Sequence, residues 1–177
     1  MPPAVVQQLE QSFTVHSLWN APDKDALLAQ VGPAIRGIAS NTVAQPLGSA
    51  LFDRLPNLEI IANYAVGYDN IDIAEAARRG IMVTNTPGVL DAEVADFTIG
   101  LTLATIREIP QADRFVRDGD WLKGGYPLST TLQGRHVGIL GLGNIGKAVA
   151  RRLEGFGVPI AYTGRQQQAD VAYTYYP

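Results

Sequence analysis

A glycine-rich stretch in the last third of the chain, GILGLGNIGKAVARRLEGFG, runs from Gly138 to Gly157 and limits the possible folds more than any other segment. The run from His136 to Leu140 contains Val, Ile and Leu and predicts a short strand. Apolar residues recur at helical spacing after the glycines, and Val158 to Tyr162 predicts a second strand. Between the first strand and the helix lies the spacing G-x-G-x-x-G, formed by Gly141, Leu142, Gly143, Asn144, Ile145 and Gly146.

Each glycine of this turn has a separate physical role. The first permits a sharp reversal, the second lets the backbone approach a pyrophosphate, and the third lets the helix pack closely on the strand. The unpaired N–H groups and the positive dipole end of the helix then face the negative charge of the ligand. Because strand, helix and second strand all fall where the motif requires them, these six residues predict a dinucleotide-binding site.

The composition excludes several classes of function. The chain has 177 residues, of which 46% are hydrophobic and 18% charged, as in a globular protein with a substantial core. A net charge of −3 without a basic block argues against nucleic acid as a partner. The absence of cysteine excludes disulfides, thiol catalysis and cysteine metal sites, and we expect no bound metal. No apolar run approaches the roughly 18 residues that span a bilayer, and the first residues lack a signal-peptide pattern, so we expect a cytoplasmic protein without a membrane partner.

The first half of the chain alternates between helix and strand signals. Helices are predicted at Ala4–Gln11, Asp23–Val31 and Leu47–Leu55, and strands at Phe13–His16, Ile35–Ala39, Leu58–Ala62 and Ile81–Thr84. Asp23 is the predicted N-cap of the second helix, and Asp72 with Glu75 has the spacing of a capping box for a helix that ends at Gly80. This alternation predicts an α/β fold with a mainly parallel sheet that helices cover on both faces.

A long apolar segment follows, from Leu90 to about Val116. It reads as a helix that is apolar over much of its surface, which is typical of burial within a domain interface or a dimer. Pro110 removes a backbone donor, so two helical pieces are expected. Residues Asp118 to Gln133 read as a loop before the first strand of the glycine-rich stretch.

The chain resembles the N-terminal part of the D-isomer-specific 2-hydroxyacid dehydrogenases, particularly the glyoxylate and hydroxypyruvate reductases. The resemblance rests on NYAVGYDNID from Asn63, GIMVTNTPGVL from Gly80, VADFTIGLTLATIREIPQADRFVRDGDW from Val94, and the glycine-rich stretch. It implies a flavodoxin-like substrate domain, of which residues 1–87 form the N-terminal portion. Residues 88–177 would then hold a connecting helix, a dimer loop and the beginning of a Rossmann nucleotide-binding domain, its first βαβ unit.

The resemblance assigns a substrate-binding role to Ala65, Val66 and Gly67, hereafter the carboxylate loop. In the family this loop uses backbone N–H groups to hold the substrate carboxylate, and a glycine after a strand exposes such donors. The alternative is a strand-to-helix turn that requires a small residue. Asp69 and Asp72 are interpreted as turn and cap residues.

The family's catalytic arginine, glutamate and histidine lie beyond Pro177, so the resemblance assigns no catalytic residue to this chain. We interpret His16 and His136 as structural or surface residues, and we give no catalytic role to Glu93 or Asp96 on the long helix. The chain is therefore expected to lack hydride transfer by itself, as a fragment of a longer enzyme or a truncated product.

The end of the second predicted strand bears on the choice of cofactor. A NAD site usually places an acidic residue about 20 residues beyond the motif, where it binds the ribose hydroxyl. Here the sequence has Gly164 and Arg165 at that place, and the nearest later acid is Asp170. A guanidinium favours a 2′-phosphate, so we expect NADP rather than NAD. The alternative is that Arg165 is an ordinary exposed loop residue.

The expected function is reduction of a small 2-oxo acid, such as glyoxylate or hydroxypyruvate, by NAD(P)H. The resemblance also implies a homodimer, built through the long helix and the loop around Trp121 to Leu128. Two alternatives remain: a non-catalytic family member that senses nucleotides or binds proteins, and an inactive truncated product.

Overall fold

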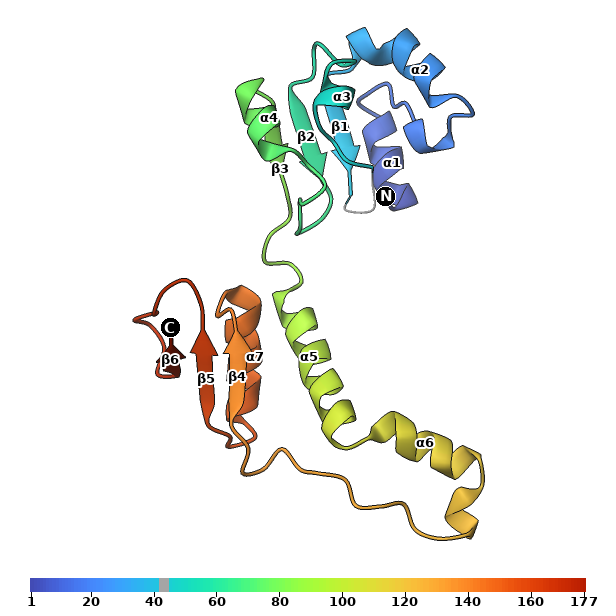
Figure 1. Ribbon diagram of the computed structural model, residues 1–177. Coiled ribbons are helices and arrows are strands. Elements are labelled where there is room, and N and C mark those ends of the chain that lie inside the picture. The colour runs from blue at the N-terminus through green and yellow to red at the C-terminus, as the bar shows by residue number, and fades with distance from the viewer. Residues whose placement is uncertain (42–44) are drawn as a thin grey trace. The chain divides into compact units, whose positions relative to one another are not determined.

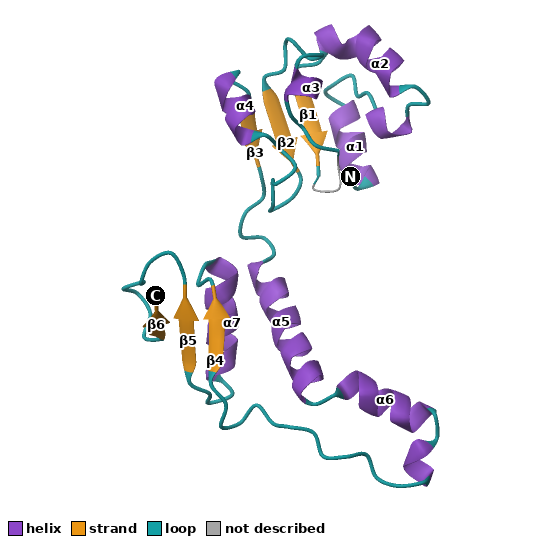
Figure 2. Cartoon of the chain, in the orientation of Figure 1, coloured by secondary structure: helices purple, strands orange, loops and turns teal. Residues whose placement is uncertain are grey.

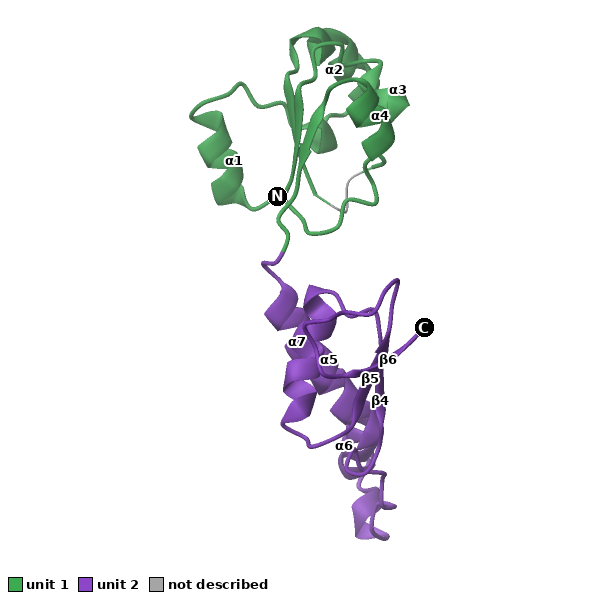
Figure 3. Cartoon of the chain, turned by 90° about the vertical axis from the view of Figure 1, so that its left-hand side faces the viewer, with its two compact units in different colours: residues 1–87 green, residues 88–177 purple. Residues whose placement is uncertain are grey.

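The computed structural model describes residues 1–41 and 45–177 (Figure 1). The chain divides into two compact units, residues 1–87 and residues 88–177 (Figure 3). Both are mixed α/β units built on a parallel three-stranded sheet (Figure 2). Unit 1 ends at Pro87, a few residues after its last strand, which ends at Thr84.

Unit 1 contains a sheet with the strand order β1-β2-β3. The strands are β1 (Gly37–Ser40), β2 (Ile60–Asn63) and β3 (Met82–Thr84), and all pairings are parallel. Its helices are α1 (Pro3–Glu10), α2 (Lys24–Val31), α3 (Ser49–Phe52) and α4 (Ile73–Arg78), with single 3-10 turns at η1 (Leu18–Asn20) and η2 (Gly32–Ala34). Parallel strands joined by crossover segments place all three carboxyl ends at one edge of the sheet.

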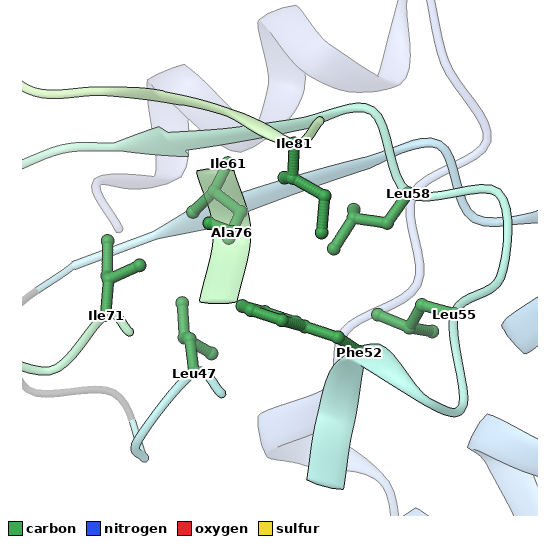
Figure 4. Packing of buried hydrophobic residues seen from close by; sticks show 8 residues of the cluster. All are labelled: Leu47, Phe52, Leu55, Leu58, Ile61, Ile71, Ala76 and Ile81. Atoms are coloured by element: carbon green, nitrogen blue, oxygen red, sulfur yellow. The ribbon is translucent and has the colours of Figure 1, made fainter. Parts of the chain in front are cut away.

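One cluster of buried apolar side chains forms the core of unit 1 (Figure 4). The ring of Phe52 lies among Leu47, Leu55 and Ala76, and Ile61 contributes from the central strand. Phe52 and Ile61 are fully buried, and each such side chain contributes about 1.5–3 kcal/mol to folding. The complete cluster is Leu47, Phe52, Leu55, Leu58, Ile61, Ile71, Ala76 and Ile81.

Two sequence predictions in unit 1 are corrected. The strand expected at Phe13–His16 is wrong, because this segment pairs with no described strand and the N–H of Phe13 still donates to Leu9 at the end of α1. The helix expected at Leu47–Leu55 shortens to α3, because Gly48 is extended and Leu47 forms an isolated parallel bridge with Ile71. The other predicted helices and strands of this unit occur, with ends shifted by a few residues.

The predicted caps are confirmed in part. The side chain of Asp23 accepts a hydrogen bond from the N–H of Ala26, and that of Asp72 accepts one from the N–H of Glu75, both at 2.9 Å. The reciprocal half of the capping box does not form, because the N–H of Asp72 donates to Leu47 instead. The Glu75 carboxylate pairs with two arginines of its own helix end, which hold its pKa at about 2.

Unit 2 contains a second parallel sheet with the order β4-β5-β6. The strands are β4 (Val137–Leu140), β5 (Ile160–Thr163) and β6 (Thr174–Tyr176); β6 was not predicted from the sequence. The helices are α5 (Asp91–Ile106), α6 (Ile109–Arg117) and α7 (Asn144–Glu154), with a 3-10 turn at η3 (Asp120–Leu122). This order matches one half of a doubly wound nucleotide-binding sheet. Both α5 and α7 lie on the same face of it (Figure 3).

The long apolar segment forms two helices, as the position of Pro110 predicted. The break falls at Glu108, whose φ of 54° lies in the left-handed region, and Pro110 then occupies the first turn of α6. Packing of α5 on α7 buries Ala95 together with Val149 and Leu153. Other apolar side chains of α5 are exposed to solvent, and Phe97 is 69% exposed. No helix in the described part of the chain has the length and apolar character to cross a membrane.

Candidate functional site

The glycine turn (residues 141–146) joins β4 to α7. Gly141 has a φ of +92°, a conformation that costs other residues about 1–2 kcal/mol, and its N–H donates to the carbonyl of Thr163 at 2.9 Å. Gly143 is the N-cap of α7, with extended backbone angles, and its carbonyl accepts from the N–H of Lys147 at 2.8 Å. The chain therefore reverses at the first glycine and enters the helix at the second.

The second and third glycines have very different surroundings. A Cβ atom on Gly146 would lie 2.2 Å from the carbonyl oxygen of Gly141, closer than any real contact, so only hydrogen fits there. A Cβ atom on Gly143 would meet nothing within 4 Å. The third glycine thus permits the close packing of helix on strand, and the second borders open space that a ligand group can enter.

The start of α7 offers free donors to that open space. No side chain caps this helix, and no described residue accepts a hydrogen bond from the N–H of Asn144, Ile145 or Gly146. Three unpaired N–H groups and the positive end of the helix dipole together form an anion-binding arrangement. Asn144 and Ile145 are exposed beside it.

Leu142 has a different role from the other residues of the glycine turn. Its side chain is buried with Ala150 and Tyr162 in a small cluster beneath the turn. Its carbonyl accepts a hydrogen bond from the side-chain amide of Gln168 at 2.6 Å. The backbone of Gln168 in turn donates to the hydroxyl of Tyr162 at 2.7 Å. Leu142 therefore anchors the turn to the sheet and to the loop after β5.

That loop carries the residues predicted to select the cofactor. Gly164 directly follows β5, and its carbonyl accepts from the hydroxyl of Tyr175 at 3.1 Å. Arg165 is exposed, and no described acidic side chain pairs with it. The nearest later acid, Asp170, lies 2.7 Å from the ammonium of Lys147, which lowers the pKa of that carboxyl. Asp170 is thus paired with Lys147 of α7, whereas the guanidinium of Arg165, after the end of β5, has no described acidic partner.

The carboxylate loop follows β2 in unit 1. The carbonyls of its three residues are all bonded inside the chain: Ala65 accepts from the N–H of Thr86, Val66 from the amide of Asn85, and Gly67 from the amide of Asn63, at 2.8–2.9 Å. The N–H of Ala65 donates to the carbonyl of Asn63. No described residue accepts from the N–H groups of Val66 and Gly67. The loop therefore presents these two donors, and the Ala65 N–H is already used.

Sequence reasoning missed the side chains that hold this loop. Asn63 lies at the end of β2, where the hydroxyl of Ser40 donates to its side-chain oxygen at 3.1 Å, and Asn85 follows the end of β3. The available signal was the presence of a polar residue at the end of each predicted strand. Its meaning depended on the strand order and register, which place Ser40 opposite Asn63.

The remaining candidates show no catalytic arrangement. Asp96 pairs with Arg152, which lowers its pKa, and the pair ties α5 to α7. His16 is exposed in unit 1, and His136 is exposed directly before β4. Among the described residues no group of acids and histidines could hold a metal ion.

Comparison with known proteins identifies what these features resemble. Residues 1–174 match a family model described as "D-isomer specific 2-hydroxyacid dehydrogenase, catalytic domain". A glyoxylate/hydroxypyruvate reductase of Arabidopsis thaliana is 45% identical over 170 residues, which are 96% of this chain and 54% of that protein.

Two solved structures are similar over the whole chain. A 2-hydroxyacid dehydrogenase of Ketogulonicigenium vulgare has a TM-score of 0.90 at 44% identity, and the match covers 56% of that protein. An NADPH-dependent glyoxylate/hydroxypyruvate reductase of Sinorhizobium meliloti, in complex with NADP and malonate, has a TM-score of 0.84 at 43% identity, and 55% of it is covered. The chain thus spans about half the length of the relatives it matches.

Proposed function

Because the chain belongs to the D-isomer-specific 2-hydroxyacid dehydrogenase family, we propose that it supplies two binding elements of an NAD(P)H-dependent 2-oxo acid reductase. The glycine turn binds the pyrophosphate of the cofactor, and the carboxylate loop binds the carboxylate of a small substrate such as glyoxylate or hydroxypyruvate. In this proposal unit 1 is part of the substrate domain, and unit 2 holds the first βαβ unit of the nucleotide domain.

The observation that carries the proposal is the arrangement at the start of α7. The carbonyl of Gly141 leaves room for only a hydrogen atom on the Cα of Gly146, and the space beside Gly143 is open. The uncapped N–H groups of Asn144, Ile145 and Gly146 directly follow Gly143 in the first turn of α7. A loop that merely reverses the chain needs neither the open space nor the uncapped helix, so the geometry supports a ligand with a phosphate group.

In the proposed role, the residues of this chain bind and orient the reactants. The bound nicotinamide would supply the hydride. The N–H groups of Val66 and Gly67 would neutralise and align the substrate carboxylate. No residue of this chain matches the catalytic arginine, glutamate or histidine of the family. We therefore propose that none of these 177 residues carries out the proton transfer.

NADP is the proposed cofactor in preference to NAD. Arg165 is exposed and unpaired by any described acid at the end of β5, and Asp170 is engaged by Lys147. An acceptor for the ribose hydroxyl is therefore missing where NAD sites have one, and a donor for a 2′-phosphate is present. The Sinorhizobium meliloti relative was solved with NADP.

A homodimer is the proposed assembly. The open side of α5 exposes Val94, Phe97 and Leu101, and the segment after α6 exposes Trp121 and Leu128. Apolar side chains gathered in this way on one helix and its neighbouring loop support a protein interface.

The cofactor proposal is tested by titrating the chain with NADPH and with NADH in a calorimeter. We expect tighter binding of NADPH, and we expect Arg165→Ala to weaken NADPH binding by about tenfold while NADH binding stays unchanged. Arg151→Ala is the matched control, because Arg151 is also an exposed arginine of unit 2. Tighter binding of NADH, or equal effects of the two substitutions, would contradict the assignment of Arg165.

A further inference from the structure

The carboxyl ends of the unit 1 strands carry a row of three polar side chains. Ser40 and Asn63 end β1 and β2 and are opposite each other in the parallel register, and Asn85 follows β3 directly. Ser40 is 5% exposed and Asn63 3%, and they are the buried polar residues among those described. Burying polar groups costs free energy unless they are hydrogen bonded. The hydrogen bonds of this buried pair at the carboxyl ends of the strands therefore indicate what it does.

The hydrogen bonds define which way each amide points. Asn63 Nδ2 donates to the carbonyl of Gly67 at 2.8 Å, and Asn63 Oδ1 accepts from Ser40 Oγ at 3.1 Å. A carbonyl can only accept, so the contact with Gly67 fixes the orientation of the amide. Asn85 Nδ2 likewise donates to the carbonyl of Val66 at 2.9 Å. All polar atoms of the Ser40–Asn63 pair that face the loop are thus satisfied.

Holding a carbonyl fixes the next N–H group as well. In a planar trans peptide the C=O of one residue and the N–H of the next point in opposite directions. The bond from Asn85 to the carbonyl of Val66 therefore turns the N–H of Gly67 away from Asn85. The bond from Asn63 to the carbonyl of Gly67 likewise turns the N–H of Tyr68 away from Asn63. No described residue accepts a hydrogen bond from the N–H of Tyr68.

We propose that Ser40, Asn63 and Asn85 are positioning residues that aim the N–H groups of Gly67, in the carboxylate loop, and of the adjacent Tyr68 at a bound carboxylate. The inference rests on the proposed function of that loop and adds how the loop keeps its shape before a ligand arrives. It also shifts the donor set by one residue, from Ala65–Gly67 to Val66–Tyr68, because the N–H of Ala65 is bonded to Asn63. Preorganised donors avoid the cost of ordering the loop at the moment of binding.

The test is a titration of the isotope-labelled chain with glyoxylate, followed through the backbone amide signals of the loop. In the wild-type protein we expect saturable shifts at Val66, Gly67 and Tyr68. Asn85→Leu and Asn63→Leu each remove one hydrogen bond that orients the loop. We expect each to weaken glyoxylate binding by about tenfold. The two-dimensional spectrum reports in the same experiment whether each variant is folded.

Asn57→Leu is the matched control, because Asn57 Nδ2 donates to the carbonyl of Pro33 at 2.7 Å, the same kind of bond elsewhere in unit 1. We expect wild-type affinity for this variant. If Asn63→Leu does not fold, Asn85→Leu decides the question, because Asn85 is only half-buried. Wild-type affinity in Asn85→Leu with normal shifts would overturn the positioning role alone. Absence of any loop shift in the wild-type protein would overturn the carboxylate loop itself, and the inference with it.

Discussion

The glycine turn of unit 2 and the carboxylate loop of unit 1 both follow a parallel strand, but opposite kinds of residue shape them. The glycine turn depends on side chains that are absent: Gly146 lets α7 approach the carbonyl of Gly141, and Gly143 leaves space open. The carboxylate loop depends on side chains that are present, because the amides of Asn63 and Asn85 hold two of its carbonyls. Steric exclusion thus sets the close approach of helix to strand in one turn, and side-chain amides set the carbonyl directions in the other.

This difference predicts how each turn responds to substitution. A turn fixed by sterics fails abruptly when an atom is added, because a backbone carbonyl cannot move aside as a flexible side chain does. A loop held by hydrogen bonds loses affinity in steps, because each bond contributes about 0.5–1.5 kcal/mol. The glycine turn is therefore expected to show the larger single effect on stability.

The largest expected effect comes from Gly146→Val. The added atoms would overlap the carbonyl of Gly141, where a Cβ lies at only 2.2 Å, and α7 would have to move off β4. We expect the substitution to lower the free energy of unfolding by about 1–3 kcal/mol or more, measured by urea unfolding followed by circular dichroism.

Gly143→Ala separates the two roles of the glycine turn. Gly143 has a negative φ and its Cβ would meet nothing, so the expected cost is only that of a poorer N-cap residue, about 1 kcal/mol or less. The same methyl group enters the space proposed for the pyrophosphate, and NADPH binding should weaken. Equal destabilisation by Gly143→Ala and Gly146→Val would show that the two glycines do not differ in the way the geometry indicates.

The glycine turn could be predicted from sequence because its determinants are local. Six consecutive residues specify the reversal, the open position and the close contact, and the flanking apolar runs specify the strand and helix. The two-piece helix was predictable for the same reason, since Pro110 acts on its own turn.

The determinants that sequence reasoning missed are distant in the chain. Asn63 is 23 residues from Ser40, and Asn85 is 19 residues from Val66, so their contacts exist only once strand order and register are known. The strand predicted at Phe13–His16 failed for a related reason, because an apolar run becomes a strand only if a neighbouring strand pairs with it. The capping box formed only in part because the N–H of Asp72 donates to Leu47, a residue distant in the chain, and the carboxylate of Glu75 pairs with Arg78 and Arg79.

The smallest expected effect concerns the loop that carries Arg165. Lys147 lowers the pKa of Asp170 in the folded protein, so their ion pair stabilises the fold above the unfolded-state pKa, about 3.9, and this contribution is lost as pH falls through the folded-state pKa. Asp170→Asn removes this contribution. In thermal unfolding between pH 6 and pH 3 we expect the variant to lose less stability than the wild-type protein on acidification. Parallel pH curves for the two proteins would contradict a stabilising Lys147–Asp170 pair.

Two separate turns are proposed to bind two different anionic groups, and backbone amide shifts resolved by residue measure which turn each ligand binds. With NADPH we expect shifts at the amides of residues 143–146 and at Arg165, with Val66 and Gly67 unchanged. With glyoxylate we expect the reverse pattern. If both ligands shifted the amide signals of the same turn, or if NADPH shifted none at residues 143–146, the two turns would not be separate binding sites for the two ligands.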